Sequence, residues 1–115
     1  MPSFRTPLGT LEFEILQEKV SALGRLGRRL EASLAALKSF DAAEGQDRAG
    51  DRAERRASLV AEAGEALWFL IVQREACGLY DGSSVMADYG VPIDVRNRMG
   101  PVQRPTMNRR RRRGW

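Results

Sequence analysis

The sequence contains no histidine and a single cysteine, Cys77, among its 115 residues. Histidine is the usual general base near neutral pH and the commonest metal ligand, so its absence excludes histidine-dependent catalytic triads and His-containing zinc sites. One cysteine forms no disulfide within the chain and rules out a four-cysteine zinc site, which fits a reducing compartment. We therefore expect no metal, no cofactor, a cytoplasmic location and an inert Cys77 thiol.

Long apolar runs are also missing. The longest extends over seven residues, from Ala66 to Val72, whereas about 20 are needed to span a bilayer. Near the N-terminus, Glu12, Glu14 and Glu18 interrupt the apolar segment that a secretory signal would need. We expect neither a transmembrane segment nor export.

Acidic residues are absent from the last part of the chain. From Pro101 onward there are six arginines and no acid, so residues 1–100 carry 13 basic and 15 acidic side chains, a net charge of −2 against +4 for the whole chain. Such a composition cannot bury enough apolar surface to offset ordering. We expect an extended leader at 1–9, one helical domain at 10–100 and a disordered basic tail at 101–115.

A long helix is predicted over Leu11–Phe40, with Thr10 as its N-cap. Its apolar residues recur at alternating spacings of three and four, which places them in one narrow stripe along the helix. The stripe consists of Phe13, Leu16, Val20, Leu23, Gly27, Leu30, Leu34 and Leu37. One partner helix is expected to pack on it.

A second long helix is predicted over Arg52–Cys77. Asp51 and Glu54 have the spacing of a capping box, and Gly78 provides a left-handed stop. The small, charged segment at 41–50 separates the two helical patterns and is expected to be the loop of an antiparallel hairpin.

Two short helices are predicted after the hairpin, Ser83–Tyr89 ended by Gly90 and Pro92–Met99 ended by Gly100. The second long helix is apolar at every angle over residues 67–72, so another element must cover its far side. The predicted fold class is all-α, a long antiparallel helical hairpin whose open end is capped by the two short helices.

Three stretches of the sequence resemble a bacterial family of unknown function. They read LEFEILQEK at 11–19, QREACGL at 73–79 and YGVP at 89–92. The resemblance covers residues 8–100 and points to short alphaproteobacterial proteins with no established activity. It implies a compact helical domain of bacterial, cytoplasmic origin and transfers no functional residue.

Arg74 follows the most apolar stretch of the chain and needs an ionic partner if it is desolvated. In an antiparallel hairpin it lies opposite Glu14 and Glu18, so we predict a structural ion pair with one of them. The alternative is a small helical enzyme in which Arg74 grips a carboxylate substrate. It would act together with three arginines of the first helix, Arg25, Arg28 and Arg29.

Residues 83–99 also invite comparison with a DNA-binding helix-turn-helix, because Gly90 falls where such motifs place the turn glycine. The fit is partial. Arg96 stands where the motif buries an apolar residue, and Met86 stands where it places a small one. A DNA-binding regulator with a degenerate motif is a second alternative.

The densest charge in the sequence is a run of five arginines: Arg109, Arg110, Arg111, Arg112 and Arg113. Adjacent guanidinium groups bind phosphates and carboxylates without sequence preference. The run fits contact with nucleic acid, anionic lipid or an acidic protein, and also a solvated tail without a partner.

Our main interpretation is a small non-enzymatic interaction or scaffold protein. A long hairpin exposes flanks that two short helices cover in part, so we expect self-association, with a twofold homodimer as the commonest solution. Ile15, Leu26 and Phe40 lie off the apolar stripe and are the candidates for the second face. The arginine run would contact nucleic acid or an acidic protein.

Overall fold

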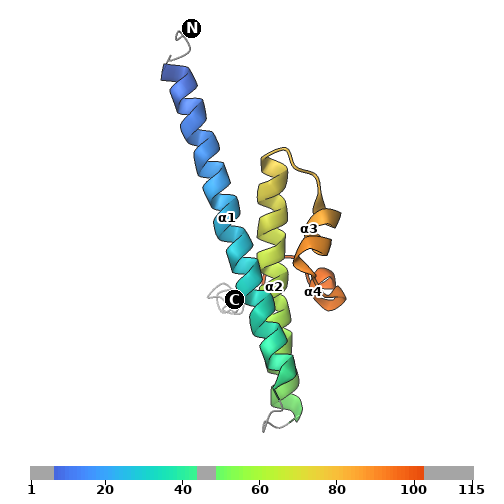
Figure 1. Cartoon of the computed structure of the whole chain (residues 1–115). Coiled ribbons are helices and arrows are strands. Elements are labelled where there is room, and N and C mark those ends of the chain that lie inside the picture. The colour runs from blue at the N-terminus through green and yellow to red at the C-terminus, as the bar shows by residue number, and fades with distance from the viewer. Residues whose placement is uncertain (1–6, 44–48, 103–115) are drawn as a thin grey trace, which may run out of the picture.

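The computed structural model describes residues 7–43 and 49–102, and these form four helices with no strand (Figure 1). The helices are α1 (Pro7–Ala42), α2 (Ala49–Ala76), α3 (Gly82–Tyr89) and α4 (Ile93–Asn97). The predicted all-α class, with two long helices followed by two short ones, is confirmed.

Both long helices begin before their predicted caps. α1 begins at Pro7, because proline lacks the backbone N–H that the first turn leaves unpaired and its fixed φ suits a helix. Thr10 is therefore not a cap, and the predicted extended leader is wrong from residue 7 onward. α2 begins at Ala49, which places Asp51 inside the first turn, where its carboxylate lies near the positive end of the helix dipole.

Glycines end α2 and α3 as predicted. Gly78 has a φ of 85°, and the following Leu79 N–H donates to the carbonyl of Arg74 at 2.8 Å, which closes the last turn of α2. Gly90 has a φ of 60° at the end of α3. A side chain would be strained at both positions.

α1 and α2 run antiparallel. Near the loop, Arg52 donates to the carbonyls of Phe40 at 2.8 Å and Ala43 at 3.0 Å, at the end of α1. Farther along the hairpin, Nη2 of Arg29 donates to Oε1 of Glu65 at 3.0 Å. These two contacts fix the register of the hairpin.

The core lies between the second half of α1 and the middle of α2. Its fully buried members include Leu30, Leu67 and Val95. α3 and α4 lie alongside α2 (Figure 1) and bury Val85 and Val95 against it. They cover the far side of α2, as its all-round apolar segment requires, and leave the open end of the hairpin uncovered.

Arg56 ties three helices together. Its Nε and Nη2 bind the carboxylate of Asp41 on α1 at 2.7 and 2.9 Å, and its Nη1 binds Asp94 on α4 at 2.9 Å. The hydrogen bonds to this guanidinium lower the pKa of Asp41, and those to the two carboxylates raise the pKa of Arg56. The network holds α4 near the hairpin loop.

The segment after α4 crosses α2 at Gly64. A Cβ on Gly64 would lie 2.5 Å from the carbonyl oxygen of Arg98, so the two backbones approach closely. Beyond this crossing, the Gly100 N–H donates to the Gly64 carbonyl at 3.4 Å and the Val102 N–H donates to Oε2 of Glu65 at 3.0 Å. The chain thus stays attached to α2 through Val102, the second residue of the predicted tail, and the five-arginine run lies outside the described residues.

We expect Gly64→Ala to destabilise the fold, because the added methyl group must push the Arg98 backbone away from α2. Overpacking of this kind costs about 1–3 kcal/mol in the free energy of unfolding. The matched control is Gly50→Ala, also within α2, where a Cβ meets nothing within 4 Å. The control should be neutral or stabilising by up to about 1 kcal/mol. Urea unfolding of both variants measures the difference, and equal stabilities would contradict the close crossing.

Candidate interaction surface

Large apolar side chains gather at the open end of the hairpin. Among the described residues, nine of the eleven exposed large apolar side chains lie on the first half of α1, the last part of α2 or the loop that follows it. We call this set the apolar end: Leu11, Phe13, Ile15, Leu16, Val20, Phe69, Val72, Leu79 and Tyr80.

α1 extends beyond α2 at this end. α2 continues for eleven residues from Glu65 to Ala76, and the same count back from Arg29 on α1 reaches Glu18. Residues 7–17 of α1 therefore project about 16 Å past the end of α2, at 1.5 Å per residue. Figure 1 shows the N-terminal turns of α1 standing alone above the rest of the molecule. We call residues 7–17 the overhang.

The apolar stripe of α1 continues from the core into this uncovered region. Phe13, Leu16 and Val20 are 60%, 56% and 59% exposed, Leu23 packs partly against the core, and Leu30 is fully buried. The spacing of the stripe is as predicted, but α2 covers its second half and leaves the first half in solvent.

The three side chains predicted to form a second face differ in their exposure. Ile15 is exposed at the apolar end. Leu26 packs partly against the core. Phe40 is half-buried under the guanidinium groups of Arg52 and Arg55, whose carbons lie 4.1 and 5.7 Å from the ring centroid. Leu26 and Phe40 are thus partly covered, by the core and by these arginines respectively, and are less accessible than Ile15.

Arg74 pairs with Asp81, and the predicted pair with Glu14 or Glu18 is wrong. Nε of Arg74 donates to Oδ1 of Asp81 at 2.9 Å, and Nη2 donates to Oδ2. The left-handed turn after α2 brings Asp81 back beside Arg74. Glu18 instead lies 3.7 Å from Arg25 on its own helix, and Glu14 belongs to the overhang beyond the end of α2.

The arginines proposed for a substrate site serve other contacts. Arg29 pairs with the buried Glu65, Arg25 with Glu18 and Arg74 with Asp81. Arg28 lies beside Gly24 on α1, 3.4 Å from the position that a Cβ there would take. These four side chains are spread along the hairpin and its corner rather than gathered around one hollow.

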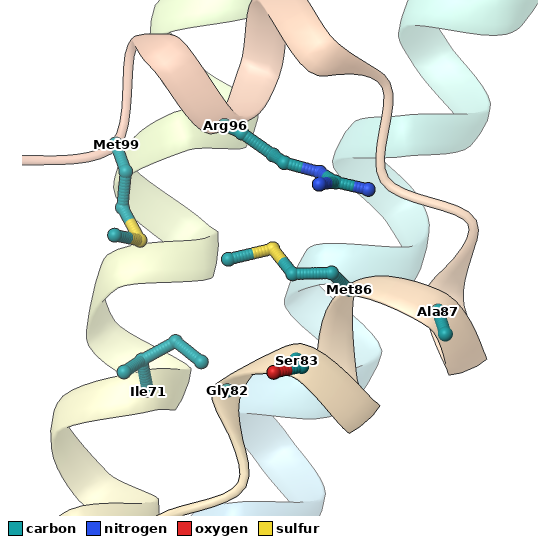
Figure 2. Close-up of a pocket in the computed structure, with 7 residues that line it drawn as sticks. All are labelled: Ile71, Gly82, Ser83, Met86, Ala87, Arg96 and Met99. Carbon is teal, nitrogen blue, oxygen red and sulfur yellow. The ribbon is translucent and has the colours of Figure 1, made fainter.

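A hollow of about 420 Å³ lies between α2, α3 and α4 (Figure 2). Arg96 extends across it over Met86, and Met99 and Ile71 face it from the other side. Its lining also includes Gly82, Ser83 and Ala87. Arg96 is the sole charged group of this lining, so the hollow offers no acid and base acting together.

A second hollow of about 530 Å³ lies between the last part of α1, the start of α2 and the turn before α4. Its charged lining consists of Lys38, Asp41 and Arg56. Asp41 and Arg56 are bound to each other, so this charge pair holds helices together.

The segment compared with a helix-turn-helix has a short second helix. α4 contains five residues, about 8 Å of helix. Val91 and Val95 are buried against α2, and Asp94 is held by Arg56. The segment contributes Val85, Val91 and Val95 to the core.

A model of a family of unknown function, DUF6665, matches residues 3–107. The chain belongs to this family. The resemblance to a domain of unknown function is thereby confirmed, and the match extends past the expected 8–100 at both ends. Comparisons with curated proteins and with solved structures gave no match.

Two further findings bear on what this DUF6665 chain can bind. The described residues contain no cluster of three or more His, Cys, Asp or Glu side chains that could hold a metal ion. None of the described helices combines the length and the apolar character that crossing a bilayer requires. The single thiol, Cys77, is half-buried next to the stop of α2.

The Arg74–Asp81 pair makes stability depend on pH. The hydrogen bond from Arg74 lowers the pKa of Asp81 in the folded state, so the pair contributes stability above the unfolded pKa of about 4 and loses it as pH falls through the lower folded value. Asp81→Asn should therefore lower the melting temperature at pH 7, and its difference from the wild type should shrink as pH falls below about 4. A difference of the same size at every pH would contradict an ionic contribution.

Proposed function

We propose that this protein is a non-enzymatic helical interaction protein that self-associates as a homodimer through its apolar end. The observation that carries the proposal is the overhang, where one helix exposes a continuous apolar stripe with no partner in the described chain. Contiguous apolar surface of more than a few hundred Å² is rare on monomers and marks interaction sites. Covering it removes apolar area from water, the main favourable term in association.

A second copy of the chain is the partner that the surface fits best. Most soluble homo-oligomers are twofold dimers, whose interface is one patch that complements itself. The exposed half of α1 has the apolar and charged side chains that a self-complementary patch needs. It carries an apolar stripe, acids at Glu12 and Glu14, and bases at Lys19 and Arg25.

The polar groups support an interaction role over catalysis. The hollow between α2, α3 and α4 has one charged side chain. In the second hollow Asp41 and Arg56 are bound to each other, which leaves Lys38 as the remaining charged group of its lining. In catalytic sites, by contrast, acids, bases or nucleophiles that can reach the substrate line one cavity. The apolar end, in contrast, holds nine of the eleven exposed large apolar side chains among the described residues.

We expect Leu16→Asp to convert the dimer into a folded monomer. Leu16 is 56% exposed, so the change costs the isolated chain little, whereas a carboxylate buried in a dimer interface is strongly unfavourable. Sedimentation equilibrium at high micromolar concentration measures the mass, and circular dichroism checks the helices. Ile93→Asp, at a 65% exposed site on α4 away from the apolar end, is the matched control and should remain dimeric. A wild-type chain that sediments as a monomer would contradict the proposal.

We also propose that the arginine run contacts anionic partners, with nucleic acid as the class to test first. The run holds five adjacent positive charges, whereas residues 1–100 have a net charge of −2. Phosphate contacts by such a run are electrostatic and carry no sequence preference.

The test compares the full chain with a chain ending at Val102, which keeps the bond between Val102 and Glu65. The full chain should bind duplex DNA with a slope of about −4 to −5 in log affinity against log salt, since each of five phosphate contacts contributes about −0.9. The shorter chain should lose binding and keep its melting temperature. Equal binding by both chains would contradict a role of the run, and no binding by either would direct the search to acidic proteins.

A further inference from the structure

The apolar stripe of the exposed half of α1 is symmetric about position 18. Leu16 and Val20 lie two residues on either side of it, and Phe13 and Leu23 lie five residues on either side. If a twofold axis passed near Glu18, residue i would face residue 36 − i of an antiparallel copy. Phe13 would then meet Leu23 of the second copy, and Leu16 would meet its Val20. The stripe thus forms a seam that is complementary to itself in the antiparallel direction.

The charges on the same half of α1 are segregated along the helix. Residues 12–18 hold three acids and no base, and residues 19–29 hold four bases and no acid. A parallel pair would place acids beside acids and bases beside bases, which is unfavourable. In the antiparallel register Glu12 faces Gly24, next to Arg25, and Lys19 faces Gln17, next to Glu18, so acids of one copy lie near bases of the other. Glu18 is level with the axis but lies on the side of the helix opposite the stripe, because two residues correspond to a rotation of about 200°. There its carboxylate is 3.7 Å from Arg25 of its own chain.

The same placement also accounts for an exposed residue on α2. In the register set by Arg29 and Glu65, Val72 is seven residues beyond Glu65 and level with Ala22, seven residues before Arg29. Val72 is 46% exposed. A second copy whose Phe13 faces Leu23 would reach this level, so its ring could cover Val72 together with Leu23.

We infer that the homodimer is built by antiparallel pairing of the exposed half of α1, residues 11–23, with its twofold axis near Glu18. This inference rests on the proposed self-association and adds its direction and register. Seam symmetry, charge segregation and the position of Val72 are three separate features of the chain, and they favour the same arrangement.

Disulfide trapping tests the direction. In a Cys77→Ser background, chains carrying Leu16→Cys are mixed with chains carrying Val20→Cys and oxidised, and the products are separated by mass. The antiparallel seam predicts that the mixed disulfide between the two variants forms in clear excess over either symmetric one. Ile93→Cys in the same background is the control and should stay unlinked.

The outcomes separate the two proposals. Symmetric disulfides in excess over the mixed one, from chains that sediment as dimers, would overturn the antiparallel seam while self-association stands. Chains that sediment as monomers and form no disulfide would overturn both.

A charge variant gives a readout that does not depend on cysteine chemistry. Glu12→Arg combined with Glu14→Arg changes two exposed side chains of the overhang, so folding is not at risk. In the antiparallel dimer position 12 faces Gly24, beside Arg25 of the second copy, and position 14 faces Ala22, between its Lys19 and Arg25. Dimer affinity should therefore fall about tenfold at low salt and recover at high salt. In a parallel dimer they would replace one like-charge contact by another, so an unchanged affinity would overturn the inference.

Discussion

The register in which α2 packs on α1 determines which apolar surfaces of the molecule remain exposed. Arg29 and Glu65 mark this register, and Glu65 is 5% exposed beneath the guanidinium that neutralises it. From that pair, α2 ends eleven residues on, whereas α1 continues for 22 residues toward its N-terminus at Pro7. Because α1 extends beyond the end of α2, the first part of its apolar stripe has no helix packed on it. This difference in length creates the apolar end.

The chain after α2 does not cover the apolar end, because it packs along α2 instead. The turn at Gly78 reverses its direction, α3 and α4 lie alongside α2, and the segment beyond them crosses α2 where Gly64 leaves room for the Arg98 backbone. Arg56 secures α4 near the hairpin loop. The later elements therefore pack along α2, with Asp81 bound to Arg74 in its last turn and Tyr89 beside Gly27 of α1. They leave Phe69, Val72 and the overhang exposed.

Much of this fold could be predicted from the sequence, since local rules decide it. The phase of the α1 stripe and the glycine stops of α2 and α3 depend on spacing and backbone freedom within a few residues. Tertiary packing decides how far α2 extends along α1, so residue spacing alone did not predict that Phe13 is exposed. It also decides on which side of α2 the chain returns, so spacing did not predict the pairing of Arg74 with Asp81. Self-association stays a prediction, and of the three side chains that the sequence indicated for a second face, Ile15 is the exposed one.

The central claim is that the exposed half of α1 is covered by a second copy of the chain. Amide hydrogen exchange of the wild-type protein, followed at low and high micromolar concentration, tests it directly. The account predicts that protection of residues 11–23 rises with concentration, because these amides lie in a lone helix in the monomer and in a packed pair in the dimer. Protection around Leu30, in the core of each chain, should stay constant. Exchange over residues 11–23 that is equally fast at every concentration would contradict the account.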